Sequence, residues 1–164
     1  MSEQLGPVLA LVALFALILV LMAWGWRRRG ASQSSLPQPL RESLEELGEA
    51  VEVGPLDAVY VSTVLARQPL ERVVAHSLGQ RAAALVSIGA AGTWHIVREG
   101  TEPLTISADS LDEVTAGPGM AGKFVGGDGI LILRWRLGDQ LLDTGLRLAR
   151  RDDHDLLLSR KEHS

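Results

Sequence analysis

Residues 129–149, GILILRWRLGDQLLDTGLRLA, decide the fold. Two mainly apolar runs, 129–137 and 141–149, flank the short polar sequence Gly138-Asp139-Gln140. Apolar runs joined by a few turn-forming residues are typical of a β-hairpin. The sequence therefore predicts an antiparallel strand pair near the end of the chain.

Further short strands are predicted upstream of this hairpin. The segments are β-branched or apolar and are separated by turn residues such as Gly, Pro, Ser and Asp. They are residues 58–66, 81–90, 92–99, 103–107 and 111–117. After the hairpin, Asp152 or Asp153 can cap a helix whose buried side is Leu156–Leu158. About seven antiparallel strands and one closing helix predict a sandwich or partly closed barrel over residues 51–164.

The segment before this domain predicts a connector. Residues 27–50 begin with three arginines and continue as GASQSSLPQP, a composition typical of a flexible spacer. Leu40, Leu44 and Leu47 then follow at helical spacing, which predicts a short amphipathic helix.

The N-terminal run 7–26, PVLALVALFALILVLMAWGW, carries no charge. About 20 apolar residues are enough to cross a bilayer core of roughly 30 Å, so a transmembrane helix is expected. The absence of Lys or Arg in residues 1–6 argues against a cleaved signal peptide. The arginines after the run predict a single-pass protein of the plasma membrane, with residues 1–6 outside and the domain cytoplasmic. The anchor residues in this interpretation are Pro7, Trp24, Trp26, Arg27, Arg28 and Arg29.

Charge and composition exclude several classes of function. The 164 residues carry a formal charge of −4. Residues 31–164 hold 13 basic and 19 acidic residues, a charge of −6, without the basic cluster that nucleic-acid binding requires. The chain contains no cysteine, so disulfides, thiolate metal sites and cysteine nucleophiles are excluded.

The most unusual segment is glycine-rich. Gly117, Gly122 and Lys123 match the spacing of a phosphate-binding loop, but Phe124 stands where a magnesium-binding Ser or Thr is needed. The helix that should follow is also broken by glycines. We therefore expect a connection between strands that can bind a partner protein. The candidate residues are Gly117, Gly119, Gly122, Lys123, Gly126 and Gly127.

No other group of residues predicts catalysis, a cofactor or a metal. Asp152, Asp153, His154 and Asp155 are adjacent, and adjacent helical residues point in different directions, so capping is favoured over metal binding. Arg134 and Arg136 share the strand face opposite Trp135. That face is either a solvated surface or a small basic patch.

Several segments resemble a known family. They are the strand run from Ala58 to Ala149, the sequence GMAGKFVGGDGILILRW, the final DDHDLLLS, and the N-terminal run with its RRR junction. Together they are similar to small actinobacterial membrane or export proteins with a pleckstrin-homology-like (PH-like) domain. The genes of that family lie near pyrimidine-biosynthesis genes. The resemblance implies a PH-like barrel and no established activity.

The expected function is therefore a membrane-anchored, non-enzymatic interaction or scaffold module. Its partner would be a protein, bound with the help of tethering or through an exposed strand edge. The alternative is an accessory subunit of a membrane transporter or exporter.

Overall fold

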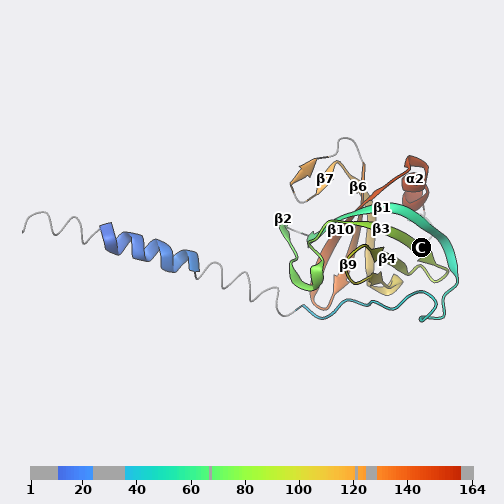
Figure 1. The fold of residues 1–164 in the computed structure, drawn as a ribbon, viewed down its shortest axis with the longest axis horizontal. Coiled ribbons are helices and arrows are strands. Elements are labelled where there is room, and N and C mark those ends of the chain that lie inside the picture. The colour runs from blue at the N-terminus through green and yellow to red at the C-terminus, as the bar shows by residue number, and fades with distance from the viewer. Residues whose placement is uncertain (1–10, 24–35, 67, 121, 125–128, 160–164) are drawn as a thin grey trace, which may run out of the picture. The chain divides into compact units, whose positions relative to one another are not determined.

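The computed structural model describes residues 11–23, 36–66, 68–120, 122–124 and 129–159 (Figure 1). The chain divides into two units, residues 1–35 and Leu36–Ser164. The described part of the first unit is one helix, and the second unit contains every described strand.

The described part of the N-terminal helix covers residues 11–23, and 13 residues at 1.5 Å each give this part a length of about 20 Å. Among the described residues, no helix combines the length and apolar character needed to cross a membrane. The transmembrane helix expected over 7–26 is therefore wrong, and so is the single-pass plasma-membrane localisation. The six residues proposed for the anchor, Pro7, Trp24, Trp26 and Arg27–Arg29, lie outside the described residues.

The second unit is mainly β. Its strands are β1 (Val51–Leu65), β2 (Gln68–Arg72), β3 (Ala82–Gly89), β4 (Trp94–Arg98), β5 (Leu104–Ile106), β6 (Leu111–Gly117), β7 (Gly119–Met120), β8 (Lys123–Phe124), β9 (Ile130–Leu137) and β10 (Gln140–Leu148). The short helices are η1 (Ala75–Ser77) and η2 (Ala108–Ser110), and the C-terminal helix is α2 (Arg151–Ser159). Eight strands form one antiparallel sheet in the order β5-β4-β3-β1-β10-β9-β6, with β2 paired to β1, while β7 and β8 pair separately.

The mainly-β antiparallel architecture with a C-terminal helix is confirmed. Each of the seven expected strands corresponds to a strand of the main sheet. The eighth, β2, was not expected because its sequence QPLER contains a proline and two charged residues.

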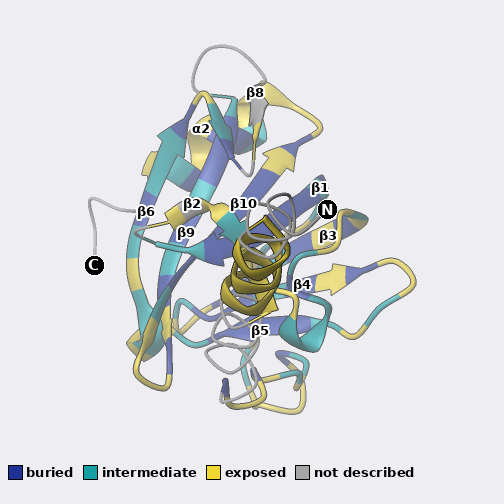
Figure 2. Cartoon of the chain, turned by 90° about the vertical axis from the view of Figure 1, so that its left-hand side faces the viewer, coloured by how far each residue is buried: buried dark blue, intermediate teal, exposed yellow. Residues whose placement is uncertain are grey.

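The sheet curls so that its two ends approach each other. Only residues 107–110 separate β5 from β6, and such a connection spans at most about 18 Å. The concave side holds the main core, which includes Trp94, Trp135 and Leu157 of α2. Figure 2 shows this core as the dark blue segments of the strands. The helix α2 packs against β10 and β6, where Leu157 is fully buried.

A bulge in β1 fixes which side chains enter this core. The register with β10 shifts between Tyr60 and Ser62, so that Thr63 lies opposite Thr144. Val61 and Val64 consequently belong to a second apolar cluster, separate from the main core.

The core side of the bulge contains a buried chain of hydrogen bonds. Tyr60 Oη donates to Leu78 O at 2.8 Å and is also bonded to Thr63 Oγ1. Thr63 Oγ1 lies 2.7 Å from Thr144 Oγ1, which accepts the Trp135 Nε1 proton at 2.9 Å. Because a carbonyl only accepts and an indole only donates, every hydroxyl must point in the same direction. This series of hydrogen bonds therefore runs from Trp135 Nε1 to Leu78 O and connects β9, β10 and β1.

A buried arginine lies over the ring of Tyr60 and connects two loops. Arg98 is 2% exposed, and its guanidinium carbon lies 4.8 Å from the centre of the Tyr60 ring. The group donates to Ser77 O at 2.9 Å and to Glu102 O at 2.8 and 3.1 Å. Arg98 thus ties the β2–β3 connection to the β4–β5 connection.

The hairpin of β7 and β8 contributes to the second apolar cluster. This cluster contains Val61, Val64, Met120 and Ile130. A Cβ on Gly145 would lie 2.6 Å from Met120 Sδ, so only glycine leaves room for the methionine there. The cluster gives β10 five consecutive buried residues, since both faces of the sheet are covered.

Residues 36–50, the N-terminal strap, pack on the domain. Leu36 and Leu44 are buried, whereas Leu40 and Leu47 are exposed. Residues 44–48 form turns, so the short amphipathic helix expected here is absent from the strap. The three leucines do not share one buried face, which removes the physical reason for a helix.

Buried Tyr60 makes the domain sensitive to alkaline pH. Burial raises the pKa of Tyr60 to about 12, from 10.0. A raised pKa favours the neutral group in the folded state, so its stabilisation is complete below about pH 10 and is lost towards about pH 12. Two units correspond to roughly 3 kcal/mol. Because Tyr60 is the single tyrosine, tyrosinate absorbance reports this residue alone.

We expect denaturant unfolding to show a loss of stability between about pH 10 and pH 12 that is absent in Tyr60→Phe. A tyrosine titrating near pH 10 in the folded protein would contradict this assignment.

Candidate functional site

The series of paired strands ends at β5 and at β6, and only one of these two edges is covered by another described segment. The edge of β5 is covered by the strap, because Thr105 N donates to Leu40 O at 2.9 Å and the two residues form a β-bridge. The edge of β6 has no strand on its outer side among the described residues. Figure 2 shows β6 at the side of the sheet next to β9, with α2 near its far end. We call this exposed side of β6 the open edge.

The β9–β10 hairpin determines which backbone groups face the open edge. Its two-residue turn, Gly138-Asp139, has Gly138 at φ +57°, so Leu137 and Gln140 form a hydrogen-bonded pair. Hydrogen-bonded pairs alternate along an antiparallel ladder. Arg134 and Ile132 consequently direct their backbone groups away from β10 and towards β6.

The same alternation passes to β6. Thr115 lies opposite Ile132, so its N–H and C=O face β9. Val114 lies opposite Leu133 and Ala116 lies opposite Leu131, so their N–H and C=O face outward. No backbone hydrogen bond to either outward pair occurs in the described residues. The open edge therefore offers the backbone N–H and C=O groups of Val114 and Ala116 to an extended segment.

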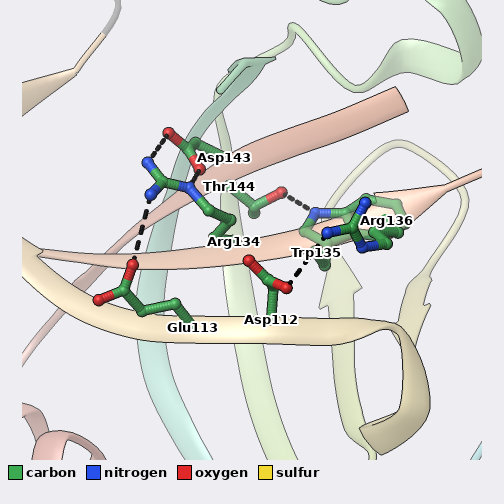
Figure 3. A network of polar contacts seen from close by, with 7 residues as sticks. All are labelled: Asp112, Glu113, Arg134, Trp135, Arg136, Asp143 and Thr144. Atoms are coloured by element: carbon green, nitrogen blue, oxygen red, sulfur yellow. Dashed lines mark hydrogen bonds and ion pairs between the residues drawn. The ribbon is translucent and has the colours of Figure 1, made fainter. Parts of the chain in front are cut away.

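A second bulge places two carboxylates together at the start of β6. The register with β9 shifts between Leu111 and Glu113. Asp112 and Glu113 consequently both reach the arginines of β9, as Figure 3 shows. Arg136 lies 3.5 Å from Asp112, and Arg134 lies 3.3 Å from Glu113.

Arg134 is held mainly by Asp143. Its Nε and Nη2 donate to the two carboxylate oxygens of Asp143 at 2.8 and 3.0 Å, a bidentate arrangement. These hydrogen bonds raise the pKa of Arg134 above its ordinary value. The arginine face therefore carries paired charges, and the alternative of a small basic patch is wrong.

The glycine-rich loop forms the β7–β8 hairpin. Gly117 ends β6, Gly119 belongs to β7, Gly122 adopts φ +77° in the turn, and Lys123 begins β8. Lys123 is thus part of a strand, whereas a phosphate-binding loop requires a helix to begin there. Gly126 and Gly127 lie outside the described residues, and partner binding by this loop stays a prediction.

The C-terminal helix packs against β10 and β6. Asp152 and Asp153 occupy its first turn, where acids interact favourably with the helix dipole. His154 is buried, and its Nε2 has no hydrogen-bond partner. No group of three or more possible metal ligands occurs in the part of the chain that the structure describes.

An exposed strand edge is expected from the sequence, but the residue pattern does not identify which strand forms it. The strands were recognisable, but an edge is a property of strand order, which the residue pattern does not contain. The one available signal was the sequence DE at the start of β6, since edge strands often carry charged residues.

One comparison with known proteins identifies a family. The family model described as "Bacterial PH domain-like" matches residues 37–162, which includes the strap, the sheet and α2. No curated protein and no solved structure matches the chain.

Proline substitutions test the direction of the β6 backbone groups. Ala116→Pro removes an outward N–H, whereas Thr115→Pro removes an N–H that bonds to β9. A proline is tolerated in an edge strand only where its N–H would face solvent. We expect Thr115→Pro to lower the free energy of unfolding by at least about 2 kcal/mol more than Ala116→Pro. Equal losses in denaturant unfolding would show that the alternation is assigned incorrectly.

Proposed function

The chain belongs to the bacterial PH domain-like family, and from this premise we propose that it is a protein-binding module that adds a partner's extended segment to β6. PH-like domains generally bind rather than catalyse, which favours a binding function. The binding mode is β-augmentation, in which the main chain of a peptide extends an existing sheet.

The observation that carries the proposal is the open edge. Val114 and Ala116 direct unused backbone groups outward at a separation that matches the repeat of a strand. The opposite edge supports the proposal, because Leu40 of the strap forms a β-bridge with Thr105 of β5. An extended segment thus already pairs with the β5 edge of this sheet.

The surroundings of the open edge suit a bound peptide. β6 is held from behind by β9 along its length and by Val114, which lies in the main core. A rigid strand loses little conformational entropy when a peptide pairs with it, which favours affinity. The helix α2 also contacts β6 and helps to hold it in place.

A peptide library displayed on phage, selected on the full chain, tests this function. We expect selected peptides to slow hydrogen exchange at the Val114 and Ala116 amides, while the Thr115 amide is already protected by β9. Ala116→Pro should weaken binding at least about tenfold, because it removes a hydrogen bond and blocks close approach. The matched control is Ala116→Gly, which keeps the outward N–H and should bind about as tightly as the unchanged protein does. Peptides that protect other strands, or that bind Ala116→Pro equally well, would refute the proposal.

A further inference from the structure

The charge around the open edge identifies the kind of partner. The elements that border it are η2, β6 and α2. Together they contain six carboxylates and one arginine: Asp109, Asp112, Glu113, Asp152, Asp153 and Asp155, against Arg151. The neighbouring arginines only partly balance this set.

The pairs that exist leave a negative surplus. Arg134 is bonded through two nitrogens to Asp143 and reaches Glu113 at the longer distance of 3.3 Å. Arg136 with Asp112 and Arg150 with Asp152 are both 3.5 Å apart and solvent-exposed. Exposed pairs of this kind contribute little and exchange easily with other partners.

Two of the acids have no partner of their own in the described residues. Asp109 and Asp153 make no ion pair or side-chain hydrogen bond there, and they belong to η2, which directly precedes β6, and to α2, which contacts β6. A segment paired with β6 would therefore lie near carboxylates that no internal cation neutralises. An ionised carboxylate accepts several hydrogen bonds, so even Asp112 retains capacity for a second cation.

We infer that the open edge binds a basic extended segment, with Lys or Arg at alternate positions, from a partner protein. This inference rests on the proposed function. Alternation matters because side chains of a strand point to opposite faces, and Asp112 and Glu113 lie on one face with the β9 arginines. The bound segment would place its basic residues on that face and smaller residues on the other.

A second copy of the chain does not fit the same edge. Two β6 strands paired with each other would bring the same acidic elements together, and like charges directly opposite are destabilising. The charge that attracts a basic segment thus disfavours self-association.

Three synthetic peptides test the inference. Each has about ten residues, the length of a long strand, and alternates Val with Lys, Gln or Glu. We expect the Lys peptide to bind the full chain most tightly, to protect the Val114 and Ala116 amides, and to weaken as salt is added. The double variant Asp109→Asn/Asp153→Asn removes no ion pair or side-chain hydrogen bond and should weaken binding of the Lys peptide about fivefold. The control Asp57→Asn/Glu99→Gln removes two exposed acids away from β6 and should change its affinity less than about twofold.

The outcomes separate the two proposals. Equal binding of all three peptides at the Val114 and Ala116 amides would overturn the basic preference and leave edge binding intact. Tighter binding of the Glu peptide would also overturn it. If no peptide protects these amides, edge binding itself fails. A dimer in sedimentation that Ala116→Pro abolishes would show that a second copy occupies the edge, which overturns the inference.

Discussion

The buried hydrogen-bond chain from Trp135 to Leu78 O is the interaction on which the rest of the domain depends. It joins β9, β10 and β1 at their centre, where every member is buried. Each hydroxyl in it donates once in a single direction, so loss of one member leaves a buried partner unsatisfied. Thr63 can join the chain only because the bulge in β1 turns it inward. The polar chain and the bulge therefore fix one register of β1 against β10.

The register of β1 against β10 agrees with the direction of the backbone groups in β6. With β1, β10 and β9 fixed, the two-residue turn at Gly138 determines which backbone groups of β9 face β6. The alternation then passes to β6 and leaves Val114 and Ala116 facing outward. Four backbone hydrogen bonds agree with this alternation independently: Thr63 N to Leu78 O, Val73 N to Thr63 O, Ala66 N to Leu141 O and Ala149 N to Asp57 O. The direction of the open edge is thus a result of packing in the core.

The sequence predicted local structure well and long-range structure poorly. Turn residues and apolar runs located the strands, because both signals lie within a few neighbouring residues. The bulge in β1 was not predicted, since AVYVSTVLA reads as a regular strand until Thr144 is placed beside it. The N-terminal run predicted a membrane span from its composition, whereas the described helix covers only residues 11–23. The open edge required the strand order, which forms between residues far apart in the chain.

The two edges of this sheet solve the same physical problem in different ways. An exposed edge is a template for unwanted pairing, and proteins protect it by covering or charging it. Here β5 is covered by the strap through Leu40 and Thr105, while β6 is bordered by carboxylates. Carboxylates beside an edge disfavour pairing with acidic or uncharged segments. They do not disfavour pairing with a basic segment. The strap gives complete protection and no binding, whereas acidic residues give selective protection. Under the proposed function, the edge suited to recognition is therefore the charged one, β6.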